Sequence, residues 1–582
     1  ISERKALVNG LENIQVQMTE AVSSSKHGTT FLQKNVPNLF VLKGNFEKEI
    51  HQQISALEIA IETATPITEI AQQFFAKSKE KQTELCAVLI AKNKKDLNQE
   101  INFFQKNITR AFEKNQILKT PRGSYFAPNP LGKKGKVAFV YPGSSTAYTG
   151  LGKDLFQLFP QLYPHFENML PDLDEYIWSD YLFPKKINEA DEDPNIYNNA
   201  IAMMSTGVFY SAAFTHILLE VFGIKPEIAF GYSMGECSSM WYALGVWSSN
   251  EAREFQDSPI FKNRFAGDLE LLAETWGISS EEAKERWISL VLLAPREKVE
   301  QLIQGEDKVY LTFVNTENEV VISGDKIACL TIAEELGCQT VTIPFQNVIH
   351  HDFCKNEEEG LIKMHRFDLN KNLDIDFYSS ITQEKIPFDS QLIAENSTAV
   401  CCEKVDFPKT VNTLLEKDAN IFIELGANAT CTGWIKNILK EKEHLAVSIN
   451  QKGKADAQAI LEVLAQLVSN GVEADLSALY IEPKVGKAPR SFMKKIDVGG
   501  ERIFDTFENT THKELFKNIK RKAVSVETKK RELAFVSGGN DYPPKSTNIE
   551  FINKAIHLQK DKNNSNMEVT TIKNKPSAEN KI

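Results

Sequence analysis

Short apolar runs alternate with amphipathic stretches along the first 130 residues. The runs at 38–45 and 84–93 are typical of β-strands. Apolar residues recur at helical spacing in the segments between and after them, at 46–65, 67–80 and 94–115. This alternation predicts a small α/β domain over 36–132, preceded by a polar lead-in linker over 1–35 and ending in a turn-rich connector.

The pattern from residue 137 onward predicts a larger α/β domain. The apolar run VAFVYPG (137–143) ends in Pro-Gly, as a buried parallel strand that feeds a loop does. Residues 198–223 predict a long apolar helix, and KPEIAFGYSMGE (225–236) predicts a strand, a turn and a helix start. We therefore expect a parallel sheet that binds its ligand at the carboxyl ends of its strands.

A third pattern interrupts this domain. Residues 288–346 give the order βαββαβ, which is typical of a ferredoxin-like subdomain inserted into the larger one. The chain then returns to the main domain with a strand, a loop and a helix over 419–440. An amphipathic helix lies within 451–500, a segment that we expect to pack back on the core. Residues 501–582 are rich in Lys, Asn, Thr and Ser and predict a mostly disordered basic tail, whose Lys/Arg clusters we interpret as a solvated tether.

Composition narrows the class of protein. The 582 residues allow two to four folded units, and the net charge of −11 argues against nonspecific nucleic-acid binding. No apolar run reaches the roughly 18 residues of a membrane helix, so we expect no membrane span. The chain begins with neither Met nor a signal pattern, and we expect it to be a piece of a longer polypeptide. Its eight scattered cysteines predict reduced thiols in the cytoplasm.

The stretch FGYSMGECSSMWYALGVW (230–247) contains the candidate chemistry. Gly231 and Gly235 flank Ser233 between a strand and a helix, as in a nucleophile elbow, where a tight turn presents the serine hydroxyl. A serine needs a base within hydrogen-bond reach. His350 and His351, which follow a strand where the chain re-enters the main domain, are both candidates. Adjacent histidines lack the i, i+4 spacing of a helical metal site, so we expect no metal.

Five segments within 137–450 occur in a characteristic order: VAFVYPGSSTAYTGLGKDLFQLFP, GIKPEIAFGYSMGECSSMWYALGVWS, VNTENEVVISGD, IPFQNVIHHDF and IFIELGANATCTGWI. Together they resemble the acyltransferase family, which includes malonyl-CoA:acyl carrier protein transacylases and the acyltransferase domains of polyketide and fatty-acid synthases. The unit at 36–130 resembles the linker domain between ketosynthase and acyltransferase domains. Residues 448–480 and the wording around Ser233 are most similar to polyunsaturated fatty acid and heterocyst glycolipid synthases. The resemblance implies an α/β-hydrolase-like parallel-sheet core with an inserted ferredoxin-like subdomain.

The resemblance also implies a role for individual residues. Ser233 matches the nucleophile, and His350 matches the catalytic histidine by its distance from the Ile-Pro pair at 343–344. The backbone N–H groups of Met234 and Ser144 would form the oxyanion hole, and Asn315 matches an asparagine near the acyl pocket.

The arginine that would hold a malonyl carboxylate is assigned to Arg264, with Arg253 as a competitor, since a guanidinium pairs bidentately with a carboxylate. The chain departs from the family at Ser144, where a glutamine is usual, and in the residues "NVI" before the histidine. A second family glutamine corresponds to a position near Ser205. These departures bear on malonyl specificity rather than on acyl transfer.

The implied function is transfer of an acyl group, with malonyl as the first candidate, from CoA to an acyl carrier protein through an acyl-Ser233 intermediate. Acyl-CoA would be the substrate, with no covalently bound cofactor. The partners would be a carrier protein with phosphopantetheine and other synthase domains such as a ketosynthase. Two alternatives stay open: an acyl hydrolase or editing enzyme of the same fold, and a non-catalytic docking domain of a megasynthase.

Overall fold

The computed structural model describes residues 28–481 except 33–35, 80–82, 170–176, 184–193, 198, 249–257, 344–345 and 371–372. Most of the expected lead-in linker and all of the expected basic tail lie outside the described residues. Every described residue belongs to one compact unit, Ile1–Lys487.

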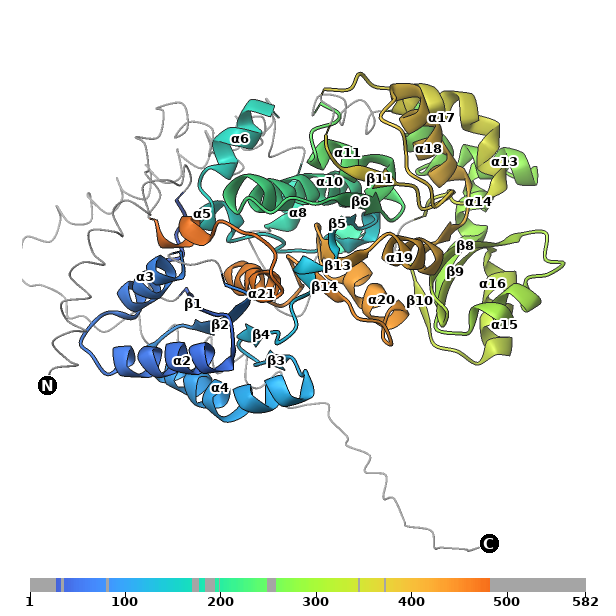
Figure 1. The fold of residues 1–582 in the computed structure, drawn as a ribbon. Helices are drawn as coiled ribbons and strands as arrows, with labels where there is room; N and C mark the ends of the chain where they lie inside the picture. The colour runs from blue at the N-terminus through green and yellow to red at the C-terminus, as the bar shows by residue number, and fades with distance from the viewer. Residues whose placement is uncertain are drawn as a thin grey trace, which may run out of the picture. The chain divides into compact units, whose positions relative to one another are not determined.

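The N-terminal part has the α/β order that its sequence predicts. Its four-stranded antiparallel sheet has the order β1-β2-β4-β3 (Figure 1). The strands are β1 (Asn38–Gly44), β2 (Leu85–Ala91), β3 (Leu118–Lys119) and β4 (Tyr125–Phe126), and the helices are α2 (Glu47–Ile61), α3 (Ile67–Ser78) and α4 (Lys94–Lys114). Asn93 caps α4 by accepting a hydrogen bond from the amide of Asp96, and Asn115 ends it in the left-handed conformation.

The central sheet is parallel throughout, with the order β11-β6-β5-β13-β14. Its strands are β5 (Lys136–Tyr141), β6 (Ile228–Gly231), β11 (Asp376–Tyr378), β13 (Ala419–Glu424) and β14 (Leu445–Ser448). Tyr141 pairs with Gly231, so the carboxyl ends of β5 and β6 lie side by side. The register therefore brings the loop after β5 next to the turn that contains Ser233, as a parallel sheet requires of its ligand-binding edge.

A long apolar helix packs in the fold next to this edge. It begins as α10 (Ala200–His216) and continues as a π-helical turn, Ile217–Val221. The span Ala200–Val221 is long and apolar enough to cross a bilayer, but most of it is buried inside the fold. Its burial on all sides explains why its apolar residues show no amphipathic stripe.

The inserted sheet is ferredoxin-like, as the sequence predicts. Four antiparallel strands have the order β10-β7-β9-β8, which is the order of a split βαβ unit. The elements are β7 (Trp287–Leu292), α15 (Arg296–Leu302), β8 (Val309–Thr316), β9 (Glu319–Asp325), α16 (Lys326–Leu336) and β10 (Thr340–Thr342). A fifth strand, β12 (Val405–Asp406), pairs parallel to β8 and was not expected.

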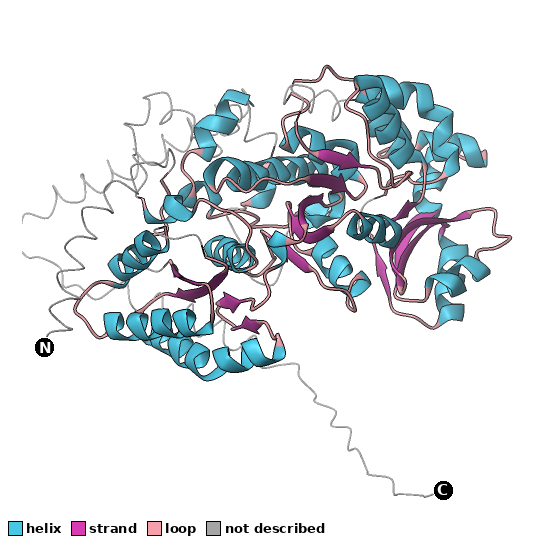
Figure 2. Ribbon diagram, viewed as in Figure 1, coloured by secondary structure: helices cyan, strands magenta, loops and turns pink. Residues whose placement is uncertain are grey.

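Further helices complete the fold (Figure 2). Before the insertion lie α5 (Leu155–Leu158), α6 (Leu162–Met169), α8 (Ser179–Leu182), α9 (Pro194–Tyr197), α11 (Met240–Ala243), α13 (Glu270–Trp276) and α14 (Ser280–Arg286). After it lie α17 (Glu358–His365), α18 (Ser390–Cys402), α19 (Phe407–Glu416), α20 (Thr430–Ile438) and α21 (Asp456–Ser469). Helix α21 contacts both β2 and β14, and one apolar core runs through it from the N-terminal sheet to the central sheet. The domain boundaries expected from the sequence therefore stay a prediction.

Candidate active site

Ser233 lies on a sharp turn between β6 and a π-helical turn, Gly235–Ser239, that leads into α11. Its backbone has a φ of 55°, in the left-handed region that non-glycine residues rarely adopt. A Cβ on Gly231 would lie 2.1 Å from the amide nitrogen of Glu236, and one on Gly235 would lie 1.9 Å from the carbonyl oxygen of Tyr141. Only glycine fits at either position, so this turn has the crowding of a nucleophile elbow.

His350 follows the insertion in sequence, whereas Ser233 precedes it, and the fold brings the two side chains together. Its Nε2 atom lies 2.8 Å from Oγ of Ser233. The His350 backbone also has a left-handed φ, of 67°, and its amide donates a 2.7 Å hydrogen bond to the carbonyl of Cys401. Non-glycine residues in this region cluster at functional sites, where the surrounding structure holds them.

The environment of His350 keeps its imidazole neutral. The side chain is 1% exposed, and the ring of Phe313 lies over it at 4.4 Å between centroids. Burial lowers the pKa of His350 to about 4, and backbone groups of Val400 and Glu403 partly oppose this effect. A neutral imidazole with its proton on Nδ1 presents Nε2 as an acceptor, which is the form that a general base needs.

His351 contacts other side chains than the serine. Its ring stacks on Phe353 at 3.6 Å, and its Nδ1 atom lies 3.4 Å from Sγ of Cys354. Burial also lowers the pKa of His351, to about 3. Of the two histidines that the sequence left open, the geometry therefore brings His350 and not His351 to the nucleophile.

A cavity of about 330 Å³ opens beside Ser233. It lies between the edge of the central sheet and the inserted sheet, because residues of both line it. The apolar part of its wall comes mainly from the insertion and includes Val291, Phe313, Val321 and Val341. This size and lining suit a small acyl chain.

Polar side chains form a network on the same wall. Tyr232, directly before the nucleophile, donates a 2.7 Å hydrogen bond to Oδ1 of Asn315. The Nδ2 atom of Asn315 donates to Glu319 at 3.0 Å, and Nε1 of Trp434 donates to the same carboxylate at 2.9 Å. Asn315 thus lies beside the cavity, as expected, and couples the insertion to the elbow. Glu319 and Trp434 were not singled out in the sequence, although both lie in segments that carry the resemblance.

The two amides expected to form an oxyanion hole lie at this edge. Met234 caps the π-helical turn after Ser233, and Ser144 begins a 3₁₀ turn after β5 and lines the cavity with Ser233. Within the described part of the chain, neither amide donates a hydrogen bond. Both remain candidates for stabilising a developing oxyanion.

The expected role of Arg264 is not supported by its surroundings. Its guanidinium donates to Glu274 at 2.7 and 3.0 Å and also pairs with Glu357. Arg264 does not line the cavity beside Ser233. A third carboxylate, that of Glu270, lies 3.7 Å from the same guanidinium. Because protein carboxylates already engage it, we do not include Arg264 in the site. The competitor Arg253 lies outside the described residues.

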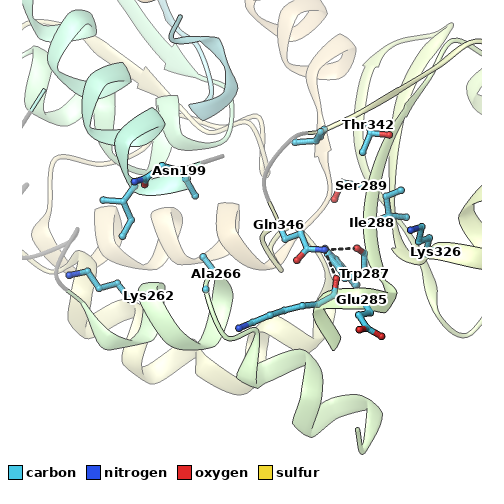
Figure 3. A pocket seen from close by; sticks show the side chains of 15 residues that line it. Asn199, Lys262, Ala266, Glu285, Trp287, Ile288, Ser289, Lys326, Thr342 and Gln346 are labelled. Carbon is cyan, nitrogen blue, oxygen red and sulfur yellow. Dashed lines mark hydrogen bonds between the residues drawn. The ribbon is translucent and has the colours of Figure 1, made fainter. Parts of the chain in front are cut away.

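A second, open cavity of about 1030 Å³ adjoins the first, since Ser289, Thr342 and Ile343 line both. Figure 3 shows Lys262 and Asn199 on one side of it and Lys326, Ser289 and Thr342 on the other. Lys284 also lines it and pairs with Asp268 at 2.8 Å. In the described part of the chain, no group of three or more His, Cys, Asp or Glu side chains is arranged to hold a metal ion.

Comparisons with known proteins identify relatives of the chain and a solved structure of similar fold. No family model matches the chain. It is 24% identical over 469 residues to one of the subunits of a polyunsaturated fatty acid synthase from Thraustochytrium sp., covering 74% of this chain and 23% of that protein. It is 23% identical over 320 residues to the malonyl CoA-acyl carrier protein transacylase of Bacillus subtilis, covering 54% of this chain and 93% of that enzyme.

A solved structure shows the same fold. The acyltransferase domain from module 8 of the salinomycin polyketide synthase superposes with a TM-score of 0.59 and 15% identity, covering 78% of this chain and all of that domain. The chain spans less than a quarter of the synthase protein from Thraustochytrium sp. that it matches. In sequence, the chain is similar to a polyunsaturated fatty acid synthase subunit and to a malonyl CoA-acyl carrier protein transacylase, and in fold to the acyltransferase domain of a polyketide synthase.

Proposed function

We propose that the chain is an acyltransferase that moves an acyl group, with malonyl as the first candidate, from CoA to the phosphopantetheine thiol of an acyl carrier protein. The observation that carries this proposal is the 2.8 Å contact between Ser233 Oγ and His350 Nε2 on an elbow beside an acyl-sized cavity. Similarity to a malonyl transacylase and to a polyunsaturated fatty acid synthase supports the choice of reaction.

The first half of the reaction acylates the serine. Nε2 of His350 takes the hydroxyl proton as Oγ of Ser233 attacks the thioester carbonyl carbon. The amides of Met234 and Ser144 would hold the oxyanion. The C–S bond then breaks, and His350 returns the proton to the departing CoA sulfur.

The second half repeats these steps with another thiol. The carrier's phosphopantetheine sulfur gives its proton to His350 and attacks the acyl-serine ester, and Ser233 leaves with the proton. Ser233 and His350 are 6% and 1% exposed, so the pair itself is shielded from bulk solvent.

The second cavity is the proposed route of the donor and of the carrier arm. CoA and a carrier's prosthetic group both bear phosphate at the far end of a pantetheine chain. Lys262 and Lys326 line the open cavity that adjoins the one beside Ser233, whereas Lys284 in the same cavity is paired with Asp268. Ammonium groups there would attract phosphate.

The proposal extends to the partners. Contact with a ketosynthase and with a carrier, and a cytoplasmic setting, follow from the resemblance and stay proposals for this chain.

Transfer to a carrier tests the function. Acyl-loaded protein is mixed with a phosphopantetheinylated carrier protein, and both chains are followed by intact mass. We expect the acyl mass to leave this chain and appear on the carrier, with Ser233→Ala as the inactive control. Release of free acid without carrier acylation would instead indicate a hydrolase, and an absence of any adduct would favour a docking domain.

A further inference from the structure

Two thiols lie in contact next to the segments that carry Ser233 and His350. Sγ of Cys237 is 3.7 Å from Sγ of Cys401. Cys237 lies in the π-helical turn after Ser233, and Cys401 lies in the last turn of α18. A disulfide has an S–S distance of about 2.05 Å, so the two sulfurs need to approach by only about 1.7 Å to form one.

The backbone of each cysteine is hydrogen-bonded to the backbone of one catalytic residue, Ser233 or His350. The amide of Cys237 donates to the carbonyl of Ser233 at 3.0 Å. The carbonyl of Cys401 accepts from the amide of His350 at 2.7 Å. A covalent bond between the two sulfurs would therefore pull together the two segments that set the distance from Oγ to Nε2.

We propose that Cys237 and Cys401 are a disulfide-forming site, oxidised by hydroperoxides, and that closing this bond displaces Ser233 relative to His350 and slows acylation. The effect on acylation rests on the proposed function, whereas formation of the bond does not. A misplacement of about 1 Å in such a pair can cost on the order of 100-fold in rate.

The chemistry needs only hydrogen peroxide as oxidant. Cys401, the more exposed of the two, attacks one peroxide oxygen and forms a sulfenic acid, and its thiol proton joins the departing hydroxide as water. The sulfur of Cys237 then attacks the sulfenic sulfur, the S–S bond forms, and the hydroxyl leaves with the Cys237 proton as water. The two sulfurs lose two electrons in all, and peroxide is reduced to water.

Nearby cysteines are placed differently and provide controls. Cys402, the next residue along α18, is buried with Cys354 in an apolar cluster against which Cys401 packs. Sγ of Cys354 donates to the carbonyl of Val348 at 3.3 Å. Cys402 also interacts electrostatically with Cys237, but the sulfur–sulfur contact of 3.7 Å is made by Cys401, so oxidation should select the pair that we name.

The test uses the full chain with and without hydrogen peroxide, followed by digestion without reductant and by Ser233 acylation. We expect a peptide cross-linked through Cys237 and Cys401, acylation about 10- to 100-fold slower, and recovery with dithiothreitol. In Cys401→Ser, the reduced and the peroxide-treated chains should acylate Ser233 at about the same rate; Cys401→Ala replaces this variant if it folds poorly. In the control Cys402→Ser, the ratio of the two rates should be the same as in the parent chain.

The outcomes separate the two proposals. A chain that acylates when reduced but forms no Cys237–Cys401 cross-link overturns the disulfide site, as does a cross-link without any change in rate. A chain that forms the cross-link but is not acylated even when reduced contradicts the proposed function alone.

Discussion

Nε2 of His350 lies 2.8 Å from Oγ of Ser233, although 117 residues separate them in the chain. The ferredoxin-like insertion lies between them in sequence and supplies one wall of the cavity beside the serine. Both residues have left-handed backbones, so the contact depends on two strained turns that the surrounding packing fixes. The insertion and the elbow therefore have to fold together for the site to exist.

Replacing each histidine separately tests the assignment of the base. His350→Ala should slow acylation of Ser233 by about 10²- to 10⁴-fold, because the general base is lost. His351→Ala should leave the rate within about tenfold, since this ring packs against Phe353 and makes no contact with the serine. Stopped reactions analysed by intact mass measure both rates. An equal loss in the two variants would contradict the assignment.

The pH dependence of acylation reports the state of His350. Its pKa of about 4 means that the neutral, active form dominates above this value and that protonation removes it as the pH falls. The single-turnover rate should thus be flat from about pH 5 to pH 8 and fall below about pH 4.5. Circular dichroism at each pH separates this loss from acid unfolding. A midpoint near the ordinary histidine pKa of about 6.5 would show that the imidazole is not desolvated.

Crowding at the elbow predicts an effect on stability. Gly235→Ala would place a methyl group 1.9 Å from the carbonyl oxygen of Tyr141 and should lower the free energy of unfolding by about 3 kcal/mol or more. Gly433→Ala is the matched control, because nothing lies within 4 Å of its Cβ position in α20. That change should be neutral or stabilise by about 0.5–1 kcal/mol. Urea unfolding measures both, and a tolerated Gly235→Ala would argue against the elbow.

The positive charge of Lys262 and Lys326 in the second cavity should affect binding of donors that carry phosphate. The double substitution Lys262→Ala, Lys326→Ala is expected to raise KM for acyl-CoA about 3- to 10-fold, because two ammonium groups no longer attract its phosphates. An acyl-N-acetylcysteamine thioester, which has no phosphate, should be used equally well by both proteins. Lys298→Ala, at an exposed position of α15 outside the cavity, is the control. A rise for both donors would mean that the lysines act on structure rather than on phosphate.

The sequence predicted helices and strands well, because their ends and order depend on residues that are close together in the chain. The helix expected at 94–115 is α4, bounded by Asn93 and Asn115, and both caps are visible in the sequence. The order of strands in the insertion follows from its βαββαβ pattern. Gly231 and Gly235 were assigned to a tight elbow from the sequence, and the close backbone approaches at both positions agree with that assignment.

Pairings between distant segments could not be predicted in the same way. His350 and His351 are adjacent, and burial against Phe313 or Phe353 decides which one meets the serine. Arg264 was assigned as the family arginine that would hold a malonyl carboxylate, but Glu274 and Glu357, 10 and 93 residues away, engage its guanidinium. Such contacts depend on tertiary structure, for which a single sequence has no periodic signal.

The most direct measurement of the central claim is the mass of the intact protein after incubation with malonyl-CoA, acetyl-CoA or a longer acyl-CoA. The account predicts a single covalent acyl adduct from at least one donor, mapped to the peptide that contains Ser233 and absent from Ser233→Ala. An unmodified mass with every donor, or an adduct that persists in Ser233→Ala, would contradict it.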